Sequence, residues 1–156
     1  MPTTELPYLD EHATVVAADA GHIWAALLDA LDRSFSGTGT AGYARAVGCV
    51  DATVSGPRPL DVGSTVPGFR VATVIPGREL VLVGRHRFSS YAFTFRVEQV
   101  GPGRSRLRAE SRAAFPGALG GFYRLLVVGT GAHVVLVRRL LATVRRRSEQ
   151  RSRSGT

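Results

Sequence analysis

The side chains best suited to chemistry in this sequence are four histidines and one cysteine. His12, His22, His86 and His133 show neither the HxH nor the HExxH spacing of zinc sites. A single cysteine allows no internal disulfide and no cysteine-based zinc site, so we predict no metal and no cofactor. Cys49 lies in a strand-like run, which favours a small buried apolar residue over a nucleophile.

His133 is the strongest candidate for a functional side chain. It lies on the apolar stripe of the last predicted helix, one turn before Val137, so we expect it to face the interior. There it could act as a general acid/base or a ligand anchor, or a carbonyl or tyrosine hydroxyl could simply satisfy it. His86 shares a strand face with Leu82 and is the second inward-facing candidate.

Two features argue against nucleotide and Schiff-base chemistry. All 20 basic residues are arginines, and without lysine there is neither a Schiff base nor a lysine-bearing phosphate loop. Residues 37–42, GTGTAG, match GxGxxG formally, but a helical segment precedes them and strand-like sequence resumes by Cys49. A dinucleotide site needs a strand before and a helix after the glycines, so we predict a flexible loop.

Hydrophobic periodicity predicts the elements that position these side chains. A strand is expected over 9–18, then a helix from Ala20 that carries Trp24. A Gly/Ser/Thr-rich segment at 34–48 ends in a short helical piece near 43–47. Five strand-like runs follow, with short Gly/Pro turns that favour an antiparallel meander: 49–55, 64–75, 79–88, 90–100 and 105–115.

The last segment reads as one long helix over residues 118–147. Its apolar stripe comprises Leu119, Phe122, Leu126, Thr130, His133, Val137, Leu140, Leu141 and Val144. A helix of this length with so continuous a stripe should lie along the inner face of the sheet. Val128 and Val135 fall on the opposite side, which suggests a homodimer or membrane contact, or packing under a loop.

The bulk composition indicates one globular domain over residues 1–148 and a basic, disordered tail over 149–156. Of the net charge of +8, most comes from residues 138–156, which hold seven arginines and one acid. A solvated helix end explains this run, and weak contact with an anionic membrane surface is the alternative; no specific nucleic-acid binding is predicted. The start does not resemble a signal peptide, and the longest uncharged apolar run, 125–137, is shorter than the ~20 residues of a membrane span. A cytoplasmic protein is expected.

Three segments resemble the START-like (SRPBCC) superfamily, which includes birch-allergen-like and polyketide cyclase/lipid-transfer proteins. They are ATVVAADAGHIWAALLDALDR (13–33), VGSTVPGFRVATVIPGRELVLVG (62–84) and FPGALGGFYRLLVVGTGAHVVLVRRLL (115–141). The resemblance rests on the order of elements, not on one motif. It implies an α+β helix-grip fold, in which a curved antiparallel sheet wraps around a long C-terminal helix, with two short helices after the first strand.

The resemblance also implies a cavity between sheet and helix for a lipid, polyketide, hormone or other apolar molecule. The side chains expected to line it are Trp24, Phe69, Tyr91, Phe93, Phe95, Ser111, Tyr123, Leu126, Thr130 and His133. A filled core that binds nothing is the plain alternative.

Three functional hypotheses follow. The first is a binding or transport protein for a hydrophobic small molecule. The second is a cyclase/dehydratase-type enzyme, in which His133 or His86 moves a proton and a tyrosine or arginine polarises a carbonyl. The third is an interaction module that contacts acidic partners through its arginine-rich C-terminus.

Overall fold

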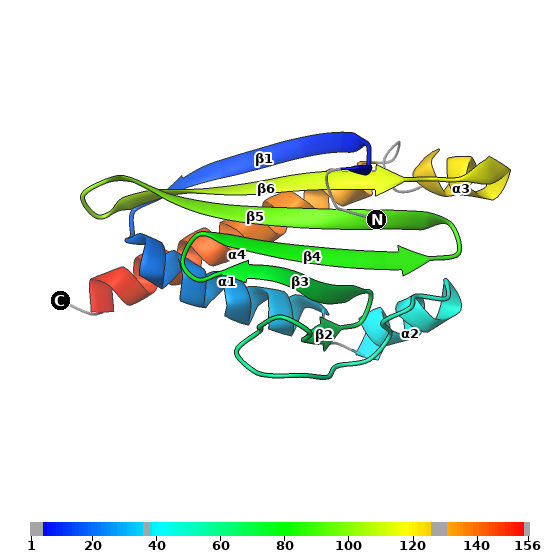
Figure 1. Cartoon of the computed structure of the whole chain (residues 1–156). Coiled ribbons are helices and arrows are strands. Elements are labelled where there is room, and N and C mark those ends of the chain that lie inside the picture. The colour runs from blue at the N-terminus through cyan, green and yellow to red at the C-terminus, as the bar shows by residue number, and fades with distance from the viewer. Residues whose placement is uncertain (1–4, 36–37, 126–130, 155–156) are drawn as a thin grey trace.

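The computed structural model describes residues 5–35, 38–125 and 131–154 and shows one curved antiparallel sheet with helices on one face (Figure 1). Its strands run in the order β1-β6-β5-β4-β3-β2. They are β1 (Tyr8–Val16), β2 (Thr65–Val66), β3 (Phe69–Ile75), β4 (Glu79–His86), β5 (Ser89–Gly101) and β6 (Arg104–Ala114). This arrangement confirms the predicted α+β helix-grip fold.

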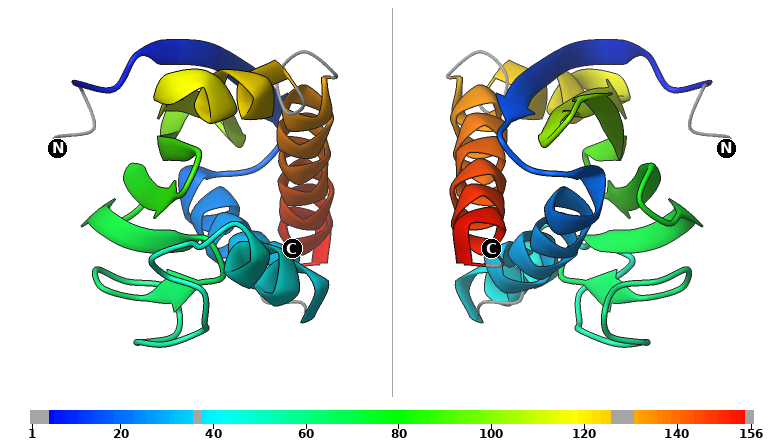
Figure 2. Two further views of the ribbon diagram at one scale, coloured as in Figure 1. Left: turned by 90° about the vertical axis from the view of Figure 1, so that its right-hand side faces the viewer. Right: turned by 90° about the vertical axis from the view of Figure 1, so that its left-hand side faces the viewer.

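The helices are α1 (Ala20–Phe35), α2 (Thr38–Ala46), α3 (Gly117–Arg124) and α4 (Ala132–Ser154). Figure 2 shows α1 and α4 on the inner face of the sheet, while α2 and α3 lie at one end of the molecule. Leu27 of α1, Val144 of α4 and Leu107 of β6 are fully buried where these layers meet. Burial of such side chains supplies most of the driving force for folding.

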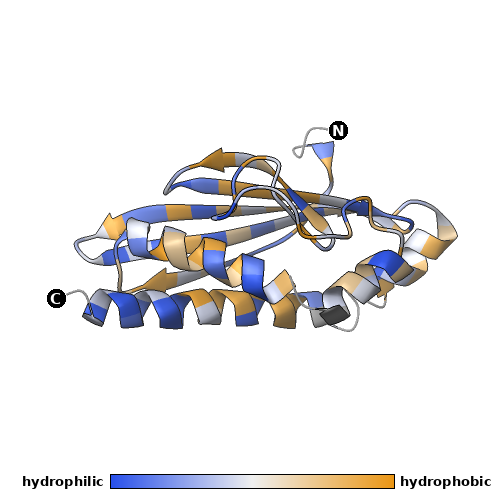
Figure 3. Ribbon diagram, turned by 90° about the horizontal axis from the view of Figure 1, so that it is seen from below, coloured by the Kyte–Doolittle hydropathy of each residue, from blue (hydrophilic) through white to orange (hydrophobic). Residues whose placement is uncertain are grey.

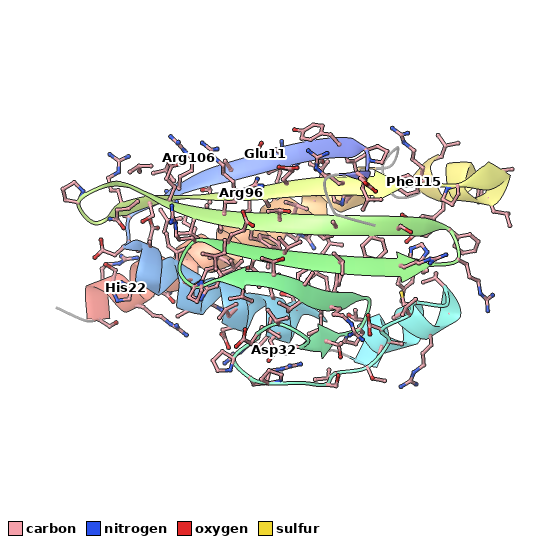
Figure 4. All side chains as sticks on the ribbon, in the orientation of Figure 1. Glu11, His22, Asp32, Arg96, Arg106 and Phe115 are labelled. Atoms are coloured by element: carbon pink, nitrogen blue, oxygen red, sulfur yellow. The ribbon has the colours of Figure 1, made fainter. Side chains whose placement is uncertain are left out.

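The alternation predicted for β5 and β6 is confirmed. On β6, Leu107, Ala109 and Ser111 are buried, whereas the arginines between them reach the outer face. Arg96 of β5 lies on that outer face (Figure 4). It binds Glu79 at 3.2 Å and Glu110 at 2.9 Å, one carboxylate on each neighbouring strand. The inner face is therefore apolar and the outer face is covered by ion pairs.

The prediction of one continuous helix over residues 118–147 is wrong. Gly131 has a φ of 76°, a left-handed conformation that an α-helix cannot contain, and it separates α3 from α4. Leu126, Val128 and Thr130 lie outside the described residues. Because α3 extends beyond the sheet, two members of the predicted stripe, Leu119 and Phe122, are exposed.

The part of the predicted apolar stripe that lies in α4 faces the core. Val137, Leu140, Leu141 and Val144 are buried against α1 and the sheet. The helix also continues to Ser154, so residues 149–154, expected in a disordered tail, are helical. The backbone N–H of Ala17 donates to Glu149 at 2.9 Å and secures this last part of the helix.

Two other segments differ from prediction. Residues 49–55 form a loop and not a strand, with a single bridge between Ser55 and Thr65; their alternation is too short to compete with the Gly56-Pro57 turn that follows. Residues 38–42 of the GTGTAG segment, predicted as a flexible loop, form the first half of α2. Here helix formation overrides the low helix propensity of glycine.

The C-terminal half of α4 is mostly hydrophilic, whereas its N-terminal half is largely hydrophobic (Figure 3). Two of its arginines are already in ion pairs, Arg145 with Glu149 and Arg147 with Asp29. Fewer cations are therefore available to an acidic partner than the sequence suggests. Across the described ranges, no helix combines the length and apolar character needed to cross a membrane.

Candidate ligand pocket

A cavity of about 540 Å³ lies between the inner face of the sheet and the helices. Its walls are rich in aromatic side chains, from the sheet Phe69, Tyr91 and Phe93 and from the helices Phe35, Tyr43 and Tyr123. Tyr43 and Leu136, both more than half exposed, also line it, so the cavity reaches the surface between α2 and α4. This size and lining are typical of small-molecule sites.

A second cavity of about 190 Å³ continues along α4. It shares Phe69, Phe93 and His133 with the first and adds Phe95 and Leu140. The two cavities thus adjoin each other below the central strands, and Phe69 lines both.

Most of the residues predicted to line a pocket do so. The main cavity brings together Phe69, Tyr91, Phe93, Ser111, Tyr123, His133 and His86, while Phe95 lines the second cavity. Trp24 lines neither cavity, because its side of α1 packs against the hydrophobic core. Leu126 and Thr130 fall outside the described residues.

A hydrogen bond to His86 fixes which of its ring nitrogens carries the proton. The backbone N–H of Phe88 donates to Nδ1 of His86 at 3.0 Å, so the neutral imidazole carries its proton on Nε2. Burial lowers the pKa of His86, which keeps the ring neutral near pH 7. The ring packs edge-on against Tyr123, with 4.8 Å between the centroids.

The Tyr91 side chain lies on the inner face of the sheet and extends over Gly84 of β4. Its hydroxyl donates to the carbonyl of Gly68 at 2.6 Å. Gly84, opposite Tyr91 on β4, makes room, because a Cβ there would overlap with both the Tyr91 ring and the Gly68 oxygen. Burial raises the pKa of Tyr91, so the phenol stays protonated.

Cys49 lines the cavity with its sulfur 3.8 Å from the Tyr91 oxygen. Burial raises the pKa of the Cys49 thiol, so it remains protonated and a poor nucleophile near pH 7. Cys49 thus lies half-buried in a loop at the cavity wall, and not buried on a strand as the sequence suggests.

Tyr43 and Tyr123 join α2 to α3 across the mouth of the cavity. Their hydroxyl oxygens are 2.5 Å apart. Burial, followed by the Tyr43 hydrogen bond, raises the pKa of Tyr123. The Tyr123 phenol therefore stays protonated.

His133 forms the polar end of the cavity on the side of β1. Its Nε2 lies 3.3 Å from Asp10 Oδ1 and 3.1 Å from Ser111 Oγ, and its ring stacks on Phe93 with 5.5 Å between the centroids. A carboxylate beside Nε2 favours a proton on that nitrogen and leaves the lone pair on Nδ1. Because Asp10 and Ser111 meet the same nitrogen, this is not the Ser-His-Asp arrangement of serine hydrolases.

Asp10 and His12 are the residues of this cluster that sequence reasoning missed. His12 Nε2 lies 3.2 Å from the second oxygen of Asp10, so the carboxylate sits between two imidazoles. Their spacing of two puts both on one face of β1, but the sequence pattern does not say that this polar face points inward. Neither this cluster nor any other group of His, Cys, Asp or Glu side chains among the described ranges is arranged to hold a metal ion.

Comparisons with known proteins find matches among solved structures only. No family model and no curated protein matches the chain. Solved structures do match: the Zhui aromatase/cyclase from Streptomyces sp. R1128 has a TM-score of 0.59 at 15% identity and covers 94% of this chain and 96% of its own. Norcoclaurine synthase from Thalictrum flavum has a TM-score of 0.53 at 14% identity, covering 94% of this chain and 96% of its own.

CalU16 from Micromonospora echinospora is similar to the same degree, with a TM-score of 0.53 at 14% identity over 92% of this chain and 83% of its own. At such identities the likeness shows the fold alone. It agrees with the helix-grip fold that the sequence predicts.

Proposed function

We propose that the protein binds a hydrophobic small molecule, lipid-like or polyketide-like, in the main cavity. The observation that carries this proposal is the cavity of about 540 Å³, whose walls are largely aromatic and whose polar groups are few. An apolar guest would gain by leaving water, and the isolated polar groups would orient it.

Filling the cavity tests this function. Ala113 of β6 lines the cavity opposite Tyr91, whereas its neighbour Ala114 lies on the other face of the strand. We expect Ala113→Phe to weaken binding of the fluorescent probe anilinonaphthalenesulfonate by about tenfold or more, because its ring takes up the space of the guest. Native mass spectrometry of the full chain should likewise show loss of any co-purified apolar molecule.

Ala114→Phe is the matched control, since it adds the same ring outside the cavity. It should bind the probe as the wild type does. Equal binding by wild type and Ala113→Phe would reject the cavity as the binding site.

A second candidate function is proton transfer on a bound carbonyl compound, as in a cyclase or dehydratase. The observation that favours it is the Asp10–His133 contact of 3.3 Å beside a cavity that also holds His86. Nδ1 of His133 would accept a proton from the carbon next to a carbonyl, while Nε2–H of His86 polarises the carbonyl oxygen. The names of two similar structures, an aromatase/cyclase and a synthase, support this as a candidate.

Deuterium exchange into a carbon acid measures this chemistry without the natural substrate. We expect the wild type to speed exchange at the central carbon of benzoylacetone in deuterium oxide, and His133→Asn to lose about 10²-fold or more of that rate. His12→Asn is the matched control, because His12 also contacts Asp10 but does not line the cavity. Unchanged exchange in His133→Asn would remove His133 as the base.

A further inference from the structure

Helix α3 packs on the body of the protein through Gly120. Gly120 is buried, and a Cβ there would lie 2.7 Å from the carbonyl carbon of Phe115 and 3.1 Å from the Phe88 oxygen. Tyr123, one turn later, stacks on Phe88 with 5.6 Å between the centroids. The side of α3 that meets the protein is thus occupied by a glycine and a tyrosine.

The opposite side of α3 presents large apolar side chains to solvent. Leu119, Phe122 and Leu125 are 70%, 61% and 68% exposed. Their spacing of three places them along one side of the helix, and Ala118 and Gly121 beside them are also exposed. Exposed apolar side chains that gather in this way mark an interaction site.

Three arginines lie at the same end of the molecule as α3. Arg45 of α2, Arg87 of the β4–β5 turn and Arg124 of α3 are exposed, and none forms an ion pair within the described part of the chain. Arg124 instead lies over the ring of Phe115, 5.9 Å from its centroid. Some other arginines are paired, for example Arg70 with Asp51 at 3.0 Å.

The segments that carry these arginines contain no acid of their own. Residues 33–50, 80–97 and 111–148, which include α2, the β4–β5 turn and α3, hold no Asp or Glu. We call the three apolar side chains of α3 together with Arg45, Arg87 and Arg124 the mouth surface. It lies at the end of the molecule that carries α2 and α3, whose Tyr43 and Tyr123 both line the cavity (Figure 1).

We propose that the mouth surface docks on an anionic phospholipid membrane. The apolar side chains project from a short helix at the end of the molecule, so they can enter the acyl layer while the arginines remain at the phosphates. The inference rests on the proposed binding function, because Tyr43 and Tyr123, on the same two helices, line the cavity for the apolar guest. The arginine-rich end of α4 lies at the opposite end of the molecule and is not part of this surface (Figure 1).

Vesicle co-sedimentation of the full chain tests the proposal. We expect binding to vesicles of phosphatidylcholine with phosphatidylglycerol, and weaker binding to phosphatidylcholine alone or at high salt. Leu119→Ser/Phe122→Ser should reduce partitioning about tenfold or more, because two large apolar groups no longer leave water. Arg45→Gln/Arg124→Gln should remove the preference for anionic vesicles.

Controls of the same type are available at the far end of the sheet. Ile75 and Val100 are exposed there, 46% and 42%, near the β3–β4 and β5–β6 turns, and Arg78 and Arg104 lie in the same region. Ile75→Ser/Val100→Ser and Arg78→Gln/Arg104→Gln should bind vesicles as the wild type does. Equal losses in these variants would show that the effect is general and would overturn the proposal.

Three other results would also overturn it: no vesicle binding by the wild type, no change in Leu119→Ser/Phe122→Ser, or a dimer in sedimentation velocity that this variant abolishes while vesicles remain unbound. The last would assign α3 to a second copy of the chain. Ala113→Phe separates this inference from the proposed function, because a filled cavity should leave vesicle binding intact.

Discussion

Gly84→Ala should destabilise the protein by about 2–4 kcal/mol, because the added methyl group competes with the Tyr91 ring and the Gly68 oxygen for the same space. Either the ring leaves the sheet and breaks its hydrogen bond to Gly68, or β3 and β4 separate locally. Denaturant unfolding followed by tyrosine and tryptophan fluorescence measures the loss. We also expect weaker binding of the fluorescent probe, since Tyr91 lines the cavity.

Gly101→Ala is the matched control in the same sheet. Gly101 ends β5, and a Cβ there would meet no atom within 4 Å. This variant should be within about 0.5 kcal/mol of the wild type. A Gly84→Ala protein of equal stability would mean that Tyr91 occupies a different position in solution.

Phe69→Ala should cost about 3 kcal/mol and enlarge the ligand space. Phe69 lines both cavities and contacts Phe35, Tyr91 and Phe93, with ring centroids 4.9, 5.2 and 5.6 Å away. Its removal takes away three ring contacts and joins the two cavities, but one side already faces open space, which places the cost at the low end for a buried phenylalanine. Unfolding measurements give the stability, and native mass spectrometry gives the size of the molecule retained.

Phe69→Leu keeps most of the volume and should lose less than about 1.5 kcal/mol. We expect it to retain the wild-type choice of guest. If Phe69→Ala bound the same molecules with the same affinity, Phe69 would not separate the cavities in solution.

The sheet could be predicted from the sequence because its strands alternate clearly. Where polar and apolar residues exchange places every second position, as in β5 and β6, the inward residues follow from the pattern, and Phe93 and Ser111 were placed correctly at the cavity. The final helix shows the limit of periodicity. An apolar stripe continues across Gly131 regardless of its left-handed backbone, so the pattern did not show where α3 ends and α4 begins.

The polar end of the cavity could not be predicted for a different reason. Asp10 and His12 alternate with Leu9, Ala13 and Val15, and burial preference alone favours turning the apolar set inward. The structure turns Asp10 and His12 inward because both meet the same cluster, in which His133 sits at the start of α4. The inward orientation of Asp10 depends on its contact with His133, which lies 123 residues away in the sequence. No local pattern contains this information.

The two histidines of the main cavity make its two ends chemically different. Near α3, the Phe88 N–H fixes the proton of the neutral His86 ring on Nε2, whereas beside β1 the Nε2 of His133 faces Asp10 and Ser111. Under the proposed binding function, a guest with an oxygen acceptor at one end would place that end at His86 and its other end near the His133 cluster. Such a cavity would distinguish the two ends of an elongated guest.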